Sequence, residues 1–218
     1  MKPACILVTG GTGYLGRALI PALLARGHSV RALVRLGSAN KLPADVEVVT
    51  GNALDSADVA RALCGATTLV HLVGVPKPSP AKAKQFREID LVSIRASVTA
   101  VAAAEPRPHV VYLSVAQPAP VMKAYLAVRA EGEQRLRDAG LDATFVRPWY
   151  VLGPGHRWPV VLLPIYAVLR RFAKTRESAE RLGFVTLPQM VATLVHAIEH
   201  PARGVRIVDV PAIRHARM

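Results

Sequence analysis

The feature that most constrains the fold is a glycine-rich segment between a strand pattern and a helix pattern. Residues 9–16 read TGGTGYLG, the short β-branched run 5–9 precedes them, and apolar residues at helical spacing follow as far as Arg26. The first N–H groups of a helix lack partners within the helix, and glycine lets a pyrophosphate approach the backbone closely. The segment therefore predicts a dinucleotide-binding turn, the alternative being a glycine turn without a ligand. The expected cofactor contacts are Gly10, Thr12, Gly13, Tyr14, Leu15 and Gly16.

Strand and helix patterns alternate along the rest of the chain. After the run 5–9, strands are expected over 29–34, 46–50, 67–73, 109–114, 143–146 and 205–210. Helices are expected over 16–26, 55–65, 80–104, 122–139 and 188–200. The stable arrangement for such strand–crossover–strand repeats is a parallel sheet covered on both faces. The prediction is an α/β doubly wound parallel sheet, a Rossmann fold, in one domain over 1–218, with residues 149–190 as a small irregular substrate lobe.

The charge balance raises a second question. The 218 residues include 28 Lys+Arg and 15 Asp+Glu, a formal net charge of +13. Nucleic acid, an anionic membrane surface and an anionic small molecule are the partners that such a charge suggests. The excess is spread over both halves of the chain, and no run of five like charges occurs. We therefore expect no nucleic-acid partner, and the alternative to a binding role for the charge is a basic surface set by genome composition.

The cysteines and apolar runs bear on the compartment. Cys5 and Cys64 lie far apart and outside any CxxC or Cys/His cluster, so no disulfide framework or metal site is expected. The glycine turn follows the N-terminal apolar run too soon for a signal peptide, and the run 158–169 is too short to span a bilayer. We predict a cytoplasmic protein without stable membrane insertion. The run 160–169 is interpreted as a lid helix over the cleft, with an anionic membrane surface as the alternative.

The end of the second expected strand bears on the choice of dinucleotide. An acidic side chain there would bind the ribose 2′-hydroxyl of NAD, but the chain has Arg35 and no acid. A guanidinium suits a 2′-phosphate because it forms paired, charge-assisted hydrogen bonds. The sequence thus predicts NADP(H) in preference to NAD(H), and the alternative is a solvated surface arginine.

Taken together, these residues resemble the short-chain dehydrogenase/reductase superfamily in its extended and atypical branches, among small NAD(P)H-binding, NmrA-like and epimerase-like proteins. The resemblance covers essentially the whole chain. It is carried by residues 9–16, 30–35 (VRALVR), 51–55 (GNALD), 70–74 (VHLVG), 125–131 (YLAVRAE) and 147–155 (RPWYVLGPG). It implies adenine contacts at Asn52 and Ala53, cofactor ribose contacts at Leu72, Val73 and Gly74, and nicotinamide contacts at Pro148 and Tyr150.

The candidate catalytic residues are Tyr125, Arg129 and Ser114. Tyr125 and Arg129 are four residues apart on an expected helix and therefore share one face. In the family the pair is Tyr and Lys: the phenol gives a proton to the substrate oxygen, and the lysine eases this transfer and bonds the nicotinamide ribose. Arg129 is expected to supply the charge and the ribose hydrogen bonds. Ser114 ends the fifth strand, but many extended members place the catalytic hydroxyl two positions further on, where this chain has Ala116.

The function predicted from these residues is NADP(H)-dependent hydride transfer to or from a small carbonyl, alcohol or sugar-nucleotide-like substrate. The alternative is a non-catalytic NADP(H)-binding redox sensor or assembly factor, with Tyr125 a helix tyrosine without chemistry. Both a monomer and a homodimer are compatible with the sequence, and the helices 80–104 and 122–139 are the candidate dimer face. We expect His71, His109 and His196 to occupy core or surface positions without a metal. Residues 156–158 are expected either to contact the substrate or to pack within their loop.

Overall fold

The computed structural model describes residues 3–155 and 181–217, and within them the main sheet is parallel throughout. Its seven strands run in the order β3-β2-β1-β4-β5-β6-β9. Their bounds are β1 Cys5–Thr9, β2 Ser29–Val34, β3 Glu47–Thr50, β4 Thr68–His71, β5 His109–Leu113, β6 Ala143–Val146 and β9 Val205–Val208. The chain winds outward from β1 in both directions, which confirms the doubly wound α/β fold.

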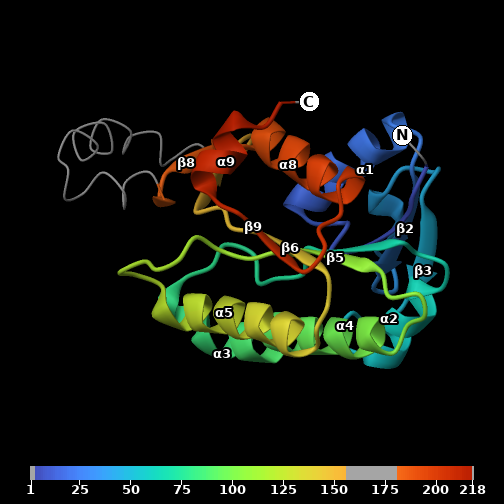
Figure 1. Cartoon of the computed structure of the whole chain (residues 1–218), viewed down its shortest axis with the longest axis horizontal. Coiled ribbons are helices and arrows are strands. Elements are labelled where there is room, and N and C mark those ends of the chain that lie inside the picture. Colours follow the sequence, from blue (N-terminus) through green and yellow to red (C-terminus); the bar gives the residue numbers. More distant parts are fainter. Residues whose placement is uncertain (1–2, 156–180, 218) are drawn as a thin grey trace.

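Helices cover both faces of this sheet (Figure 1). One face carries α1 (Tyr14–Ala25), α8 (Leu187–Glu199) and the short α9 (Val210–His215), and the other carries α2 (Ser56–Leu63), α4 (Val92–Ala102) and α5 (Lys123–Asp138). Successive residues of β1 enter two different cores: Ile6 and Val8 pack under α1 and α8, whereas Leu7 packs under α2 and α4. A central parallel strand is buried on both faces, so it is apolar without alternation.

The expected helix over 80–104 is divided into four parts. The 3-10 turn η2 (Pro80–Lys82) and the short α3 (Ala83–Gln85) lead into the π-helical turn η3 (Phe86–Leu91), which continues into α4. Phe86, Asp90 and Leu91 of η3 are buried. Because the π-helical turn closes wider hydrogen-bonded rings, it changes which side chains face the core at the point where the chain crosses the end of β4.

The C-terminal part of the chain differs from the expectation in two places. The strand predicted over 205–210 is too long: β9 ends at Val208, and α9 begins at Val210 because the Asp209 side chain caps it at the Ala212 N–H. Two short strands that the sequence did not predict, β7 (Tyr150–Leu152) and β8 (Phe184–Thr186), pair in parallel. The expected lobe over 149–190, including the interpreted lid at 160–169, falls mostly outside the described residues.

Candidate functional site

The glycine loop is packed between the end of β4 and the start of α1. A Cβ atom at Gly10, which has φ of +76°, would lie 2.8 Å from the carbonyl carbon of Leu72. A Cβ atom at Gly16 would lie 2.6 Å from the carbonyl carbon of Gly11. The Gly13 N–H donates to the Gly10 carbonyl at 3.0 Å and closes the turn. Larger residues at Gly10 and Gly16 would therefore displace the loop from the strand end.

The N-terminus of α1 has no side-chain cap. Gly13 is its N-cap residue and the first turn carries no acid, whereas α2, α8 and α9 are capped by the side chains of Asp55, Thr186 and Asp209. The free N–H groups and the helix dipole at such an end attract an anion. Backbone donors beside packed glycines fit the diphosphate of a dinucleotide.

The residues that are expected to contact the adenosine half of the cofactor follow β2 and β3. Arg35 lies directly after β2 and is exposed, and its guanidinium has no hydrogen-bond or ion-pair partner among the described residues. After β3, the Asn52 side chain accepts the Leu54 N–H at 3.0 Å, and the Asn52 N–H donates to Asp58 at 2.7 Å. This hydrogen bond, together with Arg61, lowers the pKa of Asp58 despite partial burial. The sequence did not indicate a role for Asp58, because its position is typical of an acidic residue in the first turn of a helix.

Helix α5 brings Tyr125 and Arg129 to the carboxyl ends of β4 and β5. The Arg129 guanidinium donates to the Leu113 carbonyl at 2.9 Å and more weakly to the Val73 carbonyl at 3.4 Å. It also forms a buried ion pair of 2.8 Å with Asp90 of η3. The Tyr125 ring is half-buried and lies 5.2 Å from the guanidinium carbon. The expected pair is thus at the sheet edge that the glycine loop shares.

Ser114 lies at the end of β5, but its hydroxyl points toward a side chain of α5 other than Tyr125 and Arg129. It donates to the Glu133 carboxylate at 2.6 Å. Glu133 also accepts hydrogen bonds from Arg147 and Gln117, and both Ser114 and Glu133 are buried. Neither Asp90 nor Glu133 was expected from the sequence, because each is a single acid in a helical pattern whose partner lies far along the chain.

The residues expected near the nicotinamide follow β6. Pro148 is buried, and its carbonyl accepts the Ala116 N–H at 2.9 Å. The Tyr150 ring meets the Phe184 ring edge-on at 6.2 Å, which joins β7 to β8. Burial and Tyr150 raise the pKa of Tyr14, the first residue of α1. Leu72, Val73 and Gly74 follow β4 and are partly exposed. Because β4, β5 and β6 are parallel neighbours, the residues that follow them lie at the same edge of the sheet.

A family model described as NAD(P)H-binding matches residues 10–158 of the chain, which include the glycine loop, the strand ends and the α5 pair. The chain belongs to this NAD(P)H-binding family. The match confirms the expected membership of the short-chain dehydrogenase/reductase superfamily, in its atypical branch.

Relatives of this NAD(P)H-binding chain carry reductase names. It is 31% identical to a ceramide reductase of Caulobacter vibrioides, over 94% of this chain and 64% of that protein. It is also 31% identical to the 4-hydroxy-2-methyl-3-oxo-4-farnesyl-3,4-dihydroquinoline-1-oxide ketoreductase of Stigmatella aurantiaca, over 67% of this chain and 50% of that protein. The chain thus spans less than two thirds of the length of either relative.

Solved structures of the superfamily share the fold. Bordetella bronchiseptica WbmH in complex with NAD+ superposes with a TM-score of 0.69 at 19% identity, over 94% of this chain and 75% of that one. A short-chain dehydrogenase/reductase family oxidoreductase of Burkholderia thailandensis gives 0.66 at 22% identity, over 100% of this chain and 95% of that one. The NAD(P)H-binding chain therefore has the fold of the short-chain dehydrogenase/reductase and epimerase-like proteins.

The histidine at the end of β4 in this NAD(P)H-binding chain is surrounded by hydroxyl side chains. His71 ends β4, is fully buried, and its ring nitrogens face the hydroxyls of Thr9, Ser97 and Ser93 at 3.1 to 3.3 Å. Burial, and secondarily Arg129, lowers its pKa to about 3, so the ring is neutral.

Within residues 3–155 and 181–217, no group of three or more His, Cys, Asp or Glu is arranged to hold a metal ion. Residues 156–158 lie outside the described part.

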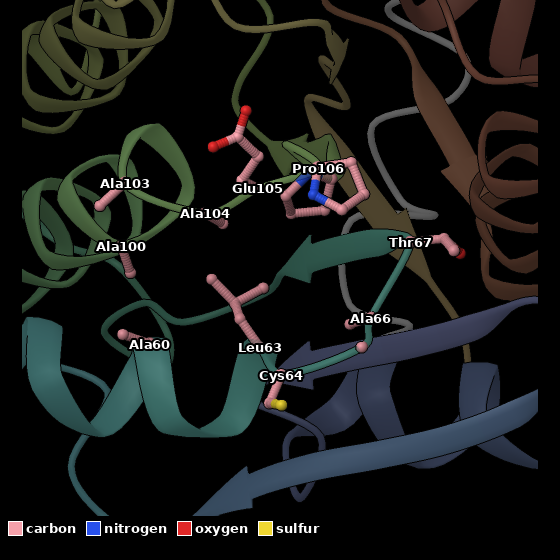
Figure 2. Close-up of a pocket in the computed structure, with 12 residues that line it drawn as sticks. Ala60, Leu63, Cys64, Ala66, Thr67, Ala100, Ala103, Ala104, Glu105 and Pro106 are labelled. Carbon is pink, nitrogen blue, oxygen red and sulfur yellow. The ribbon is translucent and has the colours of Figure 1, made fainter.

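A pocket of about 410 Å³ lies at the opposite sheet edge (Figure 2). It is lined by alanines of α2 and α4 and by Leu63, Cys64 and Glu105, next to the residues that precede β4 and β5. Ligands of open α/β sheets bind at the carboxyl ends of the strands, whereas this pocket is at the amino ends. It is therefore separate from the candidate cofactor site.

None of the described helices is long and apolar enough to cross a membrane.

Proposed function

We propose that the chain is an NADP(H)-dependent oxidoreductase that interconverts a carbonyl group and the corresponding alcohol. The observation that carries this proposal is the position of the α5 pair. Arg129 donates to the carbonyls of Val73 and Leu113, at the ends of β4 and β5, while the glycine loop packs against the neighbouring residue Leu72. A phenol and a cation are thereby fixed beside the edge at which the family binds its cofactor.

The chemistry at this edge divides between cofactor and protein. The nicotinamide, when bound, supplies a hydride to the carbonyl carbon or accepts one from the alcohol. The Tyr125 phenol gives its proton to the carbonyl oxygen during reduction and takes a proton back during oxidation. The cation of Arg129 favours the negative charge that remains on the phenol oxygen. Carbon gains a hydride and oxygen gains a proton, which balances to the alcohol.

The exposed Arg35 supports NADP(H) in preference to NAD(H). It follows β2 where a ribose 2′-substituent is expected, and residues 27–44 of the sequence around it contain no acid. For the substrate, the reductase and ketoreductase names of the relatives favour a carbonyl compound, and a UDP-glucose 4-epimerase among the structural neighbours keeps sugar nucleotides as a candidate class. The free cysteines Cys5 and Cys64 support a reducing, cytoplasmic location.

The test of this proposal is Tyr125→Phe. With a panel of ketones tested with NADPH and UDP-sugars tested with NADP+, we expect the wild type to turn over the cofactor and the variant to lose at least 99% of this turnover (roughly a hundredfold or more). NADPH affinity should change less than about threefold, because the ring remains. Lys123→Ala, an exposed change on the first turn of α5, is the matched control and should behave as wild type. Unchanged turnover in Tyr125→Phe would remove the phenol as the proton donor.

The second candidate function is NADP(H) binding without turnover, as in a redox sensor or assembly factor. It is favoured by the burial of Arg129 in an ion pair and by Ala116 at the position where many relatives carry a hydroxyl. The same assay separates the two functions. A sensor binds NADPH with the wild-type sequence but consumes none of it with any compound of the panel.

A further inference from the structure

The π-helical turn η3 presents one carboxylate to the candidate site. Asp90, the fifth of its six residues, is 1% exposed. One oxygen accepts the Val75 N–H at 2.9 Å, and the other accepts from Arg129 at 2.8 Å. A single side chain therefore ties together the turn before α4, the loop after β4 and helix α5.

The guanidinium of Arg129 directs its hydrogen bonds to protein groups. Its terminal nitrogens donate to Asp90 and to the carbonyls of Leu113 and Val73, and the side chain is 3% exposed. A methyl group at Gly74 would overlap one of these nitrogens, so the loop after β4 is shaped to admit the guanidinium. Such a cation is poorly placed to donate to the ribose of a cofactor.

Aromatic rings face the same cation. The guanidinium carbon is 5.2 Å from the Tyr125 ring centre and 5.8 Å from that of Tyr112. Burial alone would lower the pKa of Arg129, but Tyr125, Tyr112 and Asp90 together hold it above its usual value. His71, the remaining titratable neighbour, is neutral. Asp90 is thus the one carboxylate among the described groups that face this cation.

The tyrosine ring also contacts η3 directly. The Phe86 ring centre lies 5.1 Å from that of Tyr125, at an interplanar angle of 57°. Phe86 and Asp90 are the first and fifth residues of the same π-helical turn. π-Helical turns inside longer helices occur frequently at functional sites. Here the turn contacts the tyrosine directly through Phe86 and indirectly through Asp90 and Arg129.

We propose that Asp90 is a positioning residue, which holds Arg129 beneath the Tyr125 ring so that the arginine acts on the phenol by its charge and gives its hydrogen bonds to the protein instead of the cofactor ribose. The part that concerns the phenol rests on the proposed function, because it needs Tyr125 as the proton donor. The part that concerns Arg129 does not.

The first experiment observes the guanidinium itself by proton–nitrogen NMR of arginine side chains, with signals assigned through Arg129→Lys and Arg35→Lys. We expect resolved Arg129 signals in the free protein, because its ion pair restricts rotation. Addition of NADPH should shift the Arg35 signal and the backbone amides of 10–16 and leave the Arg129 signals in place. Arg129 signals that shift as far as those of Arg35 would overturn the proposal. If NADPH shifts nothing, the cofactor proposal fails, and the second experiment decides on Asp90.

The second experiment removes the carboxylate charge with Asp90→Asn. The Arg129 signals should then merge with those of exposed arginines, and the midpoint of urea unfolding should fall. The double variant Asp90→Asn with Arg129→Met should recover at least half of that fall, because no uncompensated buried charge remains. Additive losses, a double variant that does not fold, or Arg129 signals that persist in Asp90→Asn would each overturn the proposal.

A matched control and a kinetic measurement complete the design. Arg95 and Glu131 form an ion pair of 2.7 Å between α4 and α5 that is partly exposed. Arg95→Gln, Glu131→Gln and their combination should lower the midpoint much less than Asp90→Asn does and leave the Arg129 signals at wild-type values. In turnover, Asp90→Asn should lower kcat at least tenfold with the KM for NADPH within threefold. A raised KM with unchanged kcat would instead identify Arg129 as a cofactor ligand and overturn the proposal.

Discussion

The Ser114 hydroxyl donates a 2.6 Å hydrogen bond to the Glu133 carboxylate, and both side chains are buried beside the end of β5. Glu133 also accepts from Arg147, the residue that follows β6. The carboxylate therefore links two strand ends to α5. This hydrogen bond directs the Ser114 hydroxyl toward Glu133, at the edge of the sheet where Tyr125 and Pro148 lie.

The first prediction concerns this linkage. Glu133→Gln removes the charge that compensates Arg147 and should lower the free energy of unfolding by about 3 kcal/mol, as expected when one partner of a largely buried ion pair is lost. Glu131→Gln, two residues earlier, breaks partly exposed pairs with Arg95 and Arg135 and should cost about 0.5 kcal/mol. Urea unfolding measures both values. Equal losses would show that burial of Glu133 adds nothing to its contribution.

The second prediction concerns Arg35. Arg35→Asp should weaken NADPH binding about 10- to 100-fold, because a charge-assisted hydrogen bond to phosphate is worth about 1.5–3 kcal/mol, and should weaken NADH binding less than about threefold. Arg107→Asp, an exposed change before β5 at the opposite sheet edge, is the charge-matched control. Fluorescence titration gives the two dissociation constants. Equal losses for NADPH and NADH would contradict a phosphate-binding role.

The third prediction concerns the glycine loop. In Gly16→Ala the new methyl group would lie 2.6 Å from the Gly11 carbonyl carbon, so α1 must move away from the loop. We expect a loss of about 1–3 kcal/mol in the free energy of unfolding and at least a tenfold loss of NADPH affinity (roughly 1.4 kcal/mol). Gly37→Ala meets no atoms within 4 Å but has φ of +77°. It should cost about 1 kcal/mol and leave NADPH affinity unchanged.

The sequence predicts those parts of the fold that rest on local patterns. β1 and β2 have the expected bounds because each is an apolar, β-branched run that glycine turns or polar residues bound. The strands β7 and β8 have three residues each, too few to show a periodicity. The helix expected over 80–104 was wrong in its interior, because an apolar pattern does not distinguish a π-helical turn from an α-helix. The same turn sets the position of Asp90, so the partner of Arg129 could be found only in three dimensions.

The fourth prediction is a pH dependence of stability that arises from buried histidines. Burial lowers the pKa of His71 from 6.5 to about 3 and that of His109 to about 4. In this interval the unfolded chain binds protons that the folded chain does not, so stability rises with pH and is lost as pH falls below about 6.5. Each histidine contributes a slope of up to roughly 1.4 kcal/mol per pH unit, His109 until about pH 4 and His71 until about pH 3.

His71→Asn separates the two contributions. Asparagine keeps a polar group near the hydroxyls of Thr9 and Ser97 but does not titrate. The variant should be less stable than wild type near neutral pH, and its loss of stability between about pH 6 and about pH 4 should be roughly half as steep. Urea unfolding at a series of pH values measures the slope. A slope as steep as that of the wild type would mean that His71 is not held neutral in the folded protein, and that the charge of Arg129 does not face an uncharged ring.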